Sequence, residues 1–381
     1  MKVPVSRDVA VVLSGGGMSG IMMELGFLQR LRESVLWERI GVFFGTSAGA
    51  LAGSMAALDR LDDLETFLLR LRPEETFRAH RLWRLPLLGT HDYVLPRTIA
   101  ERLGDPVETA RGLAVSEREL VVVVTDVTPS PDESVPDPLF ERAYSSRTTP
   151  PEEMAQAVLA SAAISALVLP MEVGDRVGTD GGWVRNYPLG YAYERPEVEL
   201  IVGFRYVPRY PVLGAGALHA AIARLRRYSK LPAARTLITE LEEAVGREER
   251  GLPTHIADIF SRLSRVSIIR NTELEEVVAD WREQSVRELQ SLRDDVRDLV
   301  GDEAGPALAA AVEERFGRAR FPFRHDRIVP RITVEGAANG LSLDPGFRNP
   351  KPWTQEAKRR LIALGWSSAD EALGEHGFSR D

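Results

Sequence analysis

Short apolar runs alternate in the first half of the chain with segments whose apolar residues recur every three or four positions. The runs are rich in valine, isoleucine and phenylalanine, and nearly every position in them is apolar. Such runs are typical of strands that are covered on both faces, as in a parallel sheet. The sequence therefore predicts buried strands over residues 9–13, 40–44, 119–127 and 198–204.

Helical spacing separates these runs. The segment after the first run carries apolar residues at steps of three and four, namely Met22, Leu25, Leu28, Leu31 and Val35. Further helices are predicted over 48–61 and 152–164, and residues 60–118 are expected to be helical with breaks at prolines. The resulting β-α-β-α order predicts a parallel pair of strands with a right-handed crossover.

Two segments of the first half are predicted to be non-helical. Four prolines fall within residues 128–140, which we interpret as a loop. Residues 171–182 predict a short hairpin that turns at Gly174 and Asp175 and continues into a loop containing Asp180.

The character of the sequence changes after residue 205. Arginine, glutamate and alanine dominate residues 213–320, where Leu289, Leu292, Val296 and Leu299 follow a 3-4-3 spacing typical of an amphipathic helix. A final strand is predicted over 327–336 and a closing helix over 351–365. We therefore expect an α/β domain over residues 8–204 and a mainly helical region over 205–381 that packs on it or extends it.

Composition excludes several kinds of site. The chain has 381 residues, a formal net charge of −8 and a pI near 5.5, so no global basic field attracts nucleic acid. It has no cysteine, which excludes disulfides, thiolate catalysis and cysteine-based zinc sites. The N-terminus lacks a signal-peptide pattern, and no apolar stretch is long enough to span a membrane. We expect a cytoplasmic protein that could also lie peripherally at a membrane.

A serine in a tight turn follows the second predicted strand. The sequence GTSAG places Ser47 between Gly45 and Gly49, with a strand before it and a helix after it. This is the pattern of a nucleophile elbow, in which glycines allow a sharp turn and the helix N-terminus favours a developing alkoxide. The alternative is an ordinary helix start that is capped by a serine.

A glycine-rich loop, SGGGMSG, follows the first predicted strand. Its glycines, Gly15 to Gly20, fit the G-x-G-x-x-G spacing of a dinucleotide-binding turn, but the second strand ends in Phe43-Phe44-Gly45 without the acidic residue that such a site needs. The other interpretation is an oxyanion hole formed by the amides of Gly15, Gly16 and Gly17. If the two strands are neighbours, both loops lie at the same edge of the sheet.

No histidine is well placed to take a proton from Ser47. None of the six histidines follows a predicted core strand in the first 205 residues. The stretch VGTDGGWVRNYP offers Asp180 instead, followed directly by Gly181 and Gly182. An ordinary Asp-Gly turn is the alternative for this stretch.

Three separated stretches together resemble the patatin-like phospholipase family. They are SGGGMSG as an oxyanion loop, GTSAG as a nucleophile elbow and TDGGWVRNYP as a catalytic aspartate loop. The linking stretches VVVVTDV and ASAAISALVLPMEVGDRVGTDGG are also similar to the family pattern. The order and spacing agree over roughly residues 8–204.

The resemblance implies a three-layer α/β/α fold with a mostly parallel sheet, and a lipid acyl hydrolase. Ser47 would be the nucleophile and Asp180 the general base, without histidine, metal or cofactor. Gly15, Gly16 and Gly17 would supply oxyanion amides, and the remaining motif glycines are Gly20, Gly45, Gly49, Gly181 and Gly182. Two positions depart from the family pattern, which often has arginine or lysine at Ser19 and proline at Ser165.

The substrate would be a lipid or phospholipid ester. Apolar residues within 60–98 are interpreted as packed helices or as a lid over an acyl chain. The basic segment 217–235 could touch anionic lipid or form a solvated helix face, and the helix over 271–300 could mediate self-association. A catalytically idle or activator-dependent interaction module on the same fold is the alternative function.

Overall fold

A computed structural model of the chain describes residues 6–79, 91–129, 140–164, 167–207, 219, 222, 223, 225–249, 256–321, 323–338, 341, 343 and 352–378. Its strands are β1 (Val9–Leu13), β2 (Ile40–Thr46), β3 (Phe77–Ala79), β4 (His91–Tyr93), β5 (Glu119–Asp126), β6 (Glu141–Ser145), β7 (Met171–Val173), β8 (Arg176–Asp180), β9 (Leu200–Tyr206) and β10 (Arg331–Gly336).

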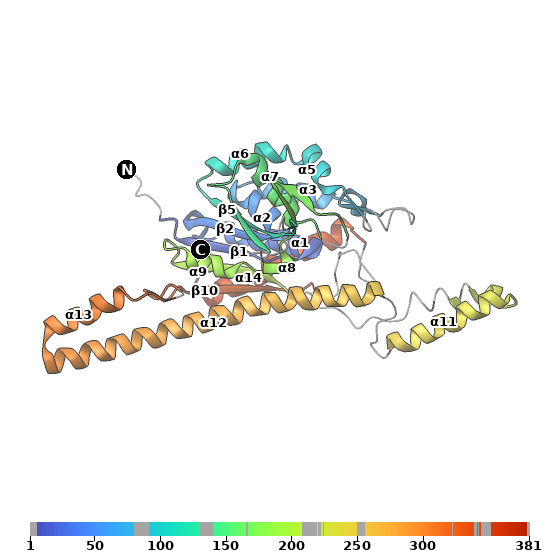
Figure 1. The fold of residues 1–381 in the computed structure, drawn as a ribbon. Helices are drawn as coiled ribbons and strands as arrows, with labels where there is room; N and C mark the ends of the chain where they lie inside the picture. Colours follow the sequence, from blue (N-terminus) through green and yellow to red (C-terminus); the bar gives the residue numbers. More distant parts are fainter. Residues whose placement is uncertain are drawn as a thin grey trace.

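Helices surround these strands (Figure 1). The α-helices are α1 (Gly17–Arg32), α2 (Ala48–Ala57), α3 (Leu61–Arg70), α5 (Leu95–Arg102), α6 (Pro106–Val115), α7 (Pro151–Ser161), α8 (Gly182–Arg185), α9 (Leu189–Glu194), α11 (Pro232–Glu249), α12 (Ile256–Ala304), α13 (Pro306–Gly317) and α14 (Gln355–Glu375). Short 3-10 turns are η1 (Trp37–Arg39), η2 (Pro73–Glu75) and η4 (Arg226–Tyr228).

The central sheet is mostly parallel, as predicted. Its strands are connected in the order β10-β9-β1-β2-β5-β8-β7, and β6 pairs with β5. The pairs β1–β2, β1–β9, β9–β10 and β2–β5 are parallel, whereas β6 and β8 run antiparallel to β5, and β7 runs antiparallel to β8. The neighbouring placement of β1 and β2 confirms that the loops after them share one edge of the sheet.

Helices cover both faces of the sheet and give three layers. Side chains alternate across β1, so that Val11 and Leu13 pack with α1 and α2, whereas Ala10 and Val12 pack with α9 and with Ala279 of α12. Strands buried on both faces need apolar residues at every position, which explains the continuous run VAVVL.

The region after residue 205 also contributes to the core of the fold. β10 pairs with β9, and α14 packs closely against α1. A Cβ on Gly26 would overlap the backbone of α14 at Ile362, and a Cβ on Gly365 would overlap the backbone of α1 at Met23. These two glycines let the helix backbones touch, so the end of the chain completes the α/β core.

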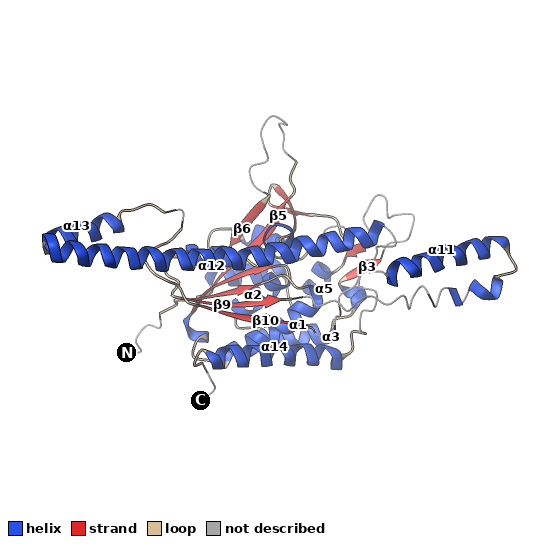
Figure 2. Ribbon diagram, turned by 90° about the horizontal axis from the view of Figure 1, so that it is seen from below, coloured by secondary structure: helices blue, strands red, loops and turns tan. Residues whose placement is uncertain are grey.

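A long helix, α12, crosses the lower side of the core and continues past it to α13 (Figure 1). It lies against α8 and α9. Figure 2 views the molecule from below and shows α12 across the front of the sheet. The predicted helical character of 213–320 is therefore confirmed for its described part.

Several predicted boundaries differ from the structure. The first helix begins at Gly17, within the glycine-rich loop, because glycines can start a helix without steric conflict. Residues 77–79 and 91–93 form the two-stranded sheet β3–β4, so the expectation of helices broken at prolines over 60–118 was wrong there. The predicted 171–182 hairpin is confirmed as β7–β8, and most of the predicted loop at 128–140 lies outside the described residues. Strand β6 was not predicted.

Candidate active site

Strands β2 and β8 meet end to end along one edge of β5. Thr125 of β5 pairs with both β6 and β8, so these two strands lie on opposite edges of β5. Val123 pairs with both β2 and β6, so β2 also lies opposite β6. β2 and β8 therefore share an edge, and their opposite directions bring their carboxyl ends together. Ser47 follows β2 directly, and Asp180 is the last residue of β8.

Ser47 stands on a strained turn between β2 and α2. Its backbone has φ 54° and ψ −115°, a conformation that is costly for a residue with a side chain. Its amide donates to Oγ of Ser161 over 2.9 Å, and the Ser161 hydroxyl donates to the carbonyl oxygen of Val123 over 2.6 Å. Ser161, which is buried, thus links the backbone of the strained turn to β5 through two hydrogen bonds.

The glycines on either side of Ser47 allow close backbone packing. A Cβ on Gly45 would overlap the carbonyl group of Gly49, and a Cβ on Gly49 would lie 2.5 Å from the carbonyl oxygen of Leu13. Neither position has room for a side chain. This crowding brings the start of α2 against the end of β1, beside the glycine-rich loop.

Asp180 is hydrogen-bonded directly to Ser47. The Ser47 hydroxyl donates to Oδ2 of Asp180 over 2.7 Å, and the Gly182 amide donates to Oδ1 over 2.8 Å. The Asp180 carbonyl oxygen accepts from the Thr125 hydroxyl over 2.7 Å. We expected Asp180 in a loop, but it ends a strand, because its backbone pairs with Val124 of β5.

Burial changes the acidity of the Asp180 carboxyl group. Asp180 is only 8% exposed and Ser47 only 6%. Removal from water raises the pKa of Asp180 to about 6, although the Gly182 amide and the Ser47 hydroxyl oppose this shift. An aspartate with this pKa is a better proton acceptor near neutral pH than an exposed one.

Gly15 links the glycine-rich loop to the segment after Asp180. Its amide donates to the carbonyl oxygen of Asn186 over 2.9 Å, so this amide is already used within the fold. A Cβ on Gly15 would overlap Oδ1 of Asn186 and would lie 3.2 Å from Cβ of Ser47. Gly15 therefore serves close packing beside the serine.

The next glycines form the N-terminus of α1. Gly17 has φ +59°, and a Cβ on Gly16 would lie 2.7 Å from Cα of Gly20. Among the described residues, the amides of Gly16 and Gly17 donate to no backbone carbonyl. A Cβ on Gly20 would make only ordinary contact with Tyr206, so these contacts do not require glycine there.

Gly181 and Gly182 accommodate the turn from β8 into α8. A Cβ on Gly181 would overlap the carbonyl oxygen of Val123. A Cβ on Gly182 would lie 3.0 Å from Oδ1 of Asp180, the atom that accepts from the Gly182 amide. Both glycines keep the backbone close to β5 and to the carboxyl group.

One protein family is similar in sequence to the first half of the chain. Residues 11–193 match the model of a family described as Patatin-like phospholipase. Residues 11–193 form a patatin-like phospholipase domain. The match spans the glycine-rich loop, Ser47 and Asp180.

Other comparisons are more distant. No curated protein matches the sequence. Among solved structures, the chain is similar to that of the crystal structure of VipD from Legionella pneumophila, with a TM-score of 0.44 and 16% sequence identity. The alignment covers 98% of this chain and 68% of that chain.

Helix α12 binds the segment that follows Asp180 in the patatin-like domain. The side-chain amide of Asn271 donates to the carbonyl oxygen of Gly182 over 2.7 Å, and its Oδ1 accepts from the Asn186 amide over 2.9 Å. The Asn186 side chain donates to Oγ1 of Thr272 over 2.9 Å. Glu275 pairs with Arg185 and accepts from the Gly190 amide over 3.0 Å. Sequence reasoning missed this contact.

Sequence reasoning also missed two residues near Ser47 and Asp180. Ser161 lies in the stretch ASAAISA. The similarity of this stretch to the family pattern was the only feature of the sequence that could have indicated a role for Ser161. Tyr93 of β4 donates its hydroxyl to the Leu159 carbonyl oxygen over 2.9 Å. Burial and the nearby charge of Asp180 raise the pKa of Tyr93. The β3–β4 sheet thus approaches Asp180.

Part of the predicted lid lies outside the described residues. Phe67 and Leu68 of α3 are buried in the core, as expected for packed helices. Phe77 stacks on Tyr93 with ring centroids 5.7 Å apart. Residues 80–90, Ser165 and several residues of the basic segment 217–235 lie outside the described ranges.

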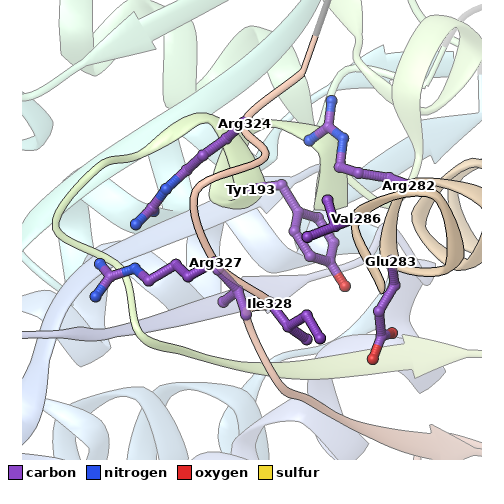
Figure 3. A pocket seen from close by; sticks show the side chains of 8 residues that line it. Tyr193, Arg282, Glu283, Val286, Arg324, Arg327 and Ile328 are labelled. Atoms are coloured by element: carbon purple, nitrogen blue, oxygen red, sulfur yellow. The ribbon is translucent and has the colours of Figure 1, made fainter. Parts of the chain in front are cut away.

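A pocket whose lining includes neither Ser47 nor Asp180 lies between α9, α12 and the segment before β10 (Figure 3). It is lined by Tyr193, Arg282, Glu283, Val286, Arg324, Arg327, Ile328 and Val329. Arg324 donates to the Arg195 carbonyl oxygen and Arg327 to that of Pro196, each over 2.8 Å. These arginines therefore connect the segment before β10 to the segment after α9 through hydrogen bonds. We assign the pocket no part in the chemistry.

Within the described ranges, no helix is long and apolar enough to cross a membrane. The same residues contain no group of three or more histidine, aspartate or glutamate side chains that could hold a metal ion.

Proposed function

We propose that this protein is a lipid acyl hydrolase of the phospholipase A or lysophospholipase type. It cleaves carboxylic esters with Ser47 as the nucleophile and Asp180 as the general base. The observation that carries this proposal is the 2.7 Å hydrogen bond from the Ser47 hydroxyl to the Asp180 carboxylate, on a strained turn at the start of a helix. The family of residues 11–193 supports a lipid ester as the substrate class.

In the acylation step, Ser47 attacks the carbonyl carbon of the ester. The Ser47 proton passes to Oδ2 of Asp180 as the Oγ–carbon bond forms and the carbonyl oxygen becomes an oxyanion. The ester bond then breaks, and the protonated Asp180 gives its proton to the leaving alcohol. The products are an acyl-enzyme on Ser47 and a free alcohol.

In the deacylation step, water takes the place of the alcohol. Asp180 accepts a proton from water while the water oxygen bonds to the acyl carbon. The bond to Ser47 breaks, the serine regains a proton from Asp180, and a fatty acid leaves. Asp180 is regenerated as a carboxylate after each half of the cycle.

Backbone amides would stabilise the oxyanion. Gly16 and Gly17 are the candidates from the glycine-rich loop, because the Gly15 amide already donates to Asn186. Ala48 is a further candidate, since the residue after the serine supplies such an amide in nucleophile elbows. Loss of one oxyanion donor typically costs about 10²- to 10³-fold in rate.

The test is labelling of the intact protein with a fluorophosphonate probe, followed by mass mapping of the adduct. We expect an adduct on Ser47 in the wild-type protein and none in Ser47→Ala. Asp180→Asn should label at least about 100-fold more slowly, because general-base catalysis is worth about 10²- to 10⁴-fold. Ser54→Ala is the matched control, since Ser54 is a buried serine of α2 whose hydroxyl donates to the Leu51 carbonyl oxygen and not to Asp180.

Substrate assays then separate lipid hydrolysis from other outcomes. Release of fatty acid from phosphatidylcholine or lysophosphatidylcholine vesicles, lost in Ser47→Ala, would support the lipid assignment. The near burial of Ser47 and Asp180 favours one rival, an activator-dependent or idle interaction module on the same fold. Absence of an adduct in folded protein, with detergent and vesicles present, would favour that rival.

A further inference from the structure

An apolar stripe runs along the outer side of α12. Between residues 274 and 299, seven large apolar side chains of this helix are from 37% to 67% exposed: Leu274, Val277, Val278, Trp281, Leu292, Val296 and Leu299. At 3.6 residues per turn, these positions fall within about 100° of the helix circumference. A long apolar stripe on an exposed helix is typical of a contact surface.

The stripe faces away from the rest of the molecule. Within residues 266–304 of α12, for which side-chain burial is described, the buried residues are Thr272, Ala279 and Val286. They recur every seven residues on the side opposite the stripe. Arg293 and Arg297 lie near Glu313 of α13, at 3.7 and 3.5 Å. In Figure 2, α12 crosses the front of the core, and no described element lies in front of it along this length. The core and α13 therefore leave the outer side of α12 accessible.

Six of the seven apolar positions of the stripe are symmetric about a point between Val286 and Arg287. The seventh, Val278, corresponds to Asp295. Two copies of α12 that cross antiparallel at this point would place three apolar pairs opposite one another: Leu274 with Leu299, Val277 with Val296 and Trp281 with Leu292. A twofold axis makes each pair occur twice, as an isologous interface requires.

Polar residues fit the same register. Ser285 and Glu288, the two polar residues on the stripe face between Trp281 and Leu292, would lie opposite each other and form a polar centre. Toward the ends, the exposed Arg270 would face the exposed Glu303 of the partner copy. Opposite charges at paired flanking positions favour one register and one orientation.

We propose that a second copy of this chain covers the stripe, through antiparallel pairing of the two α12 helices in this register. Charge disfavours a lipid surface as the occupant. Residues 270–299 contain five arginines, no lysine and nine acidic residues, for a net charge of −4. Helices that lie on membranes are usually rich in lysine and arginine around their apolar side.

The first experiment measures self-association by analytical ultracentrifugation of the full chain. The contact is a single helix pair, so we expect a dimer with a dissociation constant on the order of micromolar. Trp281→Glu should weaken dimerisation at least about tenfold, because it places a charge within the apolar seam. Val115→Glu is the matched control, since Val115 is a highly exposed apolar residue of α6. A monomer at every concentration up to about 100 µM would overturn the proposal.

Cysteine cross-linking tests the register. The chain has no native cysteine, so Leu274→Cys and Leu299→Cys can be made singly without background. An oxidised mixture of the two variants should give a disulfide-linked dimer. Leu274→Cys alone should not, because the two copies of residue 274 would be about 37 Å apart. Efficient cross-linking of Leu274→Cys with itself would overturn the antiparallel arrangement.

A vesicle-binding assay distinguishes self-pairing of α12 from binding of the stripe to a lipid surface. The probes are phosphatidylcholine vesicles with and without phosphatidylserine. Equal vesicle binding by wild-type protein and Trp281→Glu, together with loss of the dimer, supports self-pairing. A monomeric wild-type protein whose vesicle binding is lost in Trp281→Glu would overturn it in favour of a lipid surface.

Discussion

The side-chain amide of Asn271 donates to the carbonyl oxygen of Gly182 over 2.7 Å and joins the long helix α12 to the turn after Asp180. The Gly182 amide donates in turn to Oδ1 of Asp180. A residue 91 positions after Asp180 in the chain thus helps to fix the peptide groups that orient its carboxyl group. The helical C-terminal region is therefore a structural support for the candidate dyad.

Replacing Asn271 should slow the chemistry while the fold is retained. Asn271→Ala removes the hydrogen bonds of this side chain to Gly182 and Asn186, and we expect it to reduce the rate of fluorophosphonate labelling about 3- to 10-fold. Gln284→Ala is the control, because Gln284 is an exposed polar residue on the same helix. Unchanged labelling in Asn271→Ala, at unchanged thermal stability, would show that α12 does not position the aspartate.

Replacing Ser161 should reduce both the stability of the fold and the reactivity of Ser47, because its hydroxyl accepts from the Ser47 amide. In Ser161→Ala the buried amide of Ser47 loses its acceptor, which costs about 1–3 kcal/mol. We expect a loss of that size in the free energy of unfolding, measured by urea denaturation, and slower labelling of Ser47. Ser54→Ala should change neither quantity appreciably. Wild-type labelling kinetics in Ser161→Ala would mean that the strained turn is held by the glycines alone.

The central part of the fold followed from local sequence. The runs around Val11, Phe43 and Val122 predicted buried strands, since nearly every position in them is apolar. The neighbouring β1 and β2 then brought the loops of Gly15 and Ser47 to one edge of the sheet. The two residues chosen as nucleophile and base, Ser47 and Asp180, are hydrogen-bonded in the structure.

Features that depend on long-range contacts could not be predicted in the same way. The meeting of β2 and β8 on one edge of β5 depends on where each strand ends, which the apolar pattern does not specify. In the sequence, nothing distinguishes Asn271 from the other polar residues of a charged helix; only the structure shows its hydrogen bond to Gly182. Likewise, Gly26 carried no sequence signal, because its partner is the backbone of α14, more than 300 residues away.

The rate of labelling should depend on pH through Asp180. Burial raises the pKa of this carboxyl group to about 6, and only its deprotonated form can accept the serine proton. We expect the second-order labelling rate to rise about tenfold per pH unit below about pH 6 and to level off above it. The measurement is made between about pH 4.5 and 8, with the probe's own hydrolysis subtracted. A flat profile over this range would contradict Asp180 as the general base.

The same shift in pKa predicts that Asp180 destabilises the fold at neutral pH. Its pKa is about 6 in the folded chain and near 3.9 in the unfolded chain, so the folded state binds more protons between these values. The free energy of unfolding therefore falls as pH rises from about 4 to about 6, by up to about 3 kcal/mol. Asp180→Asn removes this cost, and we expect the variant to be more stable than wild type at pH 7 but equally stable near pH 4.

Asp126, on the neighbouring strand β5, offers a control because its pKa is shifted in the opposite direction to that of Asp180. Hydrogen bonds from Thr128 and Arg142 outweigh the effect of burial and lower the pKa of the Asp126 carboxyl group, so its charge stabilises the fold above its unfolded pKa. Asp126→Asn should therefore lower the free energy of unfolding at pH 7. The test is to measure the free energy of unfolding of wild type, Asp180→Asn and Asp126→Asn by urea denaturation between about pH 4 and pH 7. If Asp180→Asn is as destabilising at pH 7 as Asp126→Asn, the buried carboxylate is a net stabilising group, and the serine would have a weaker base than we infer.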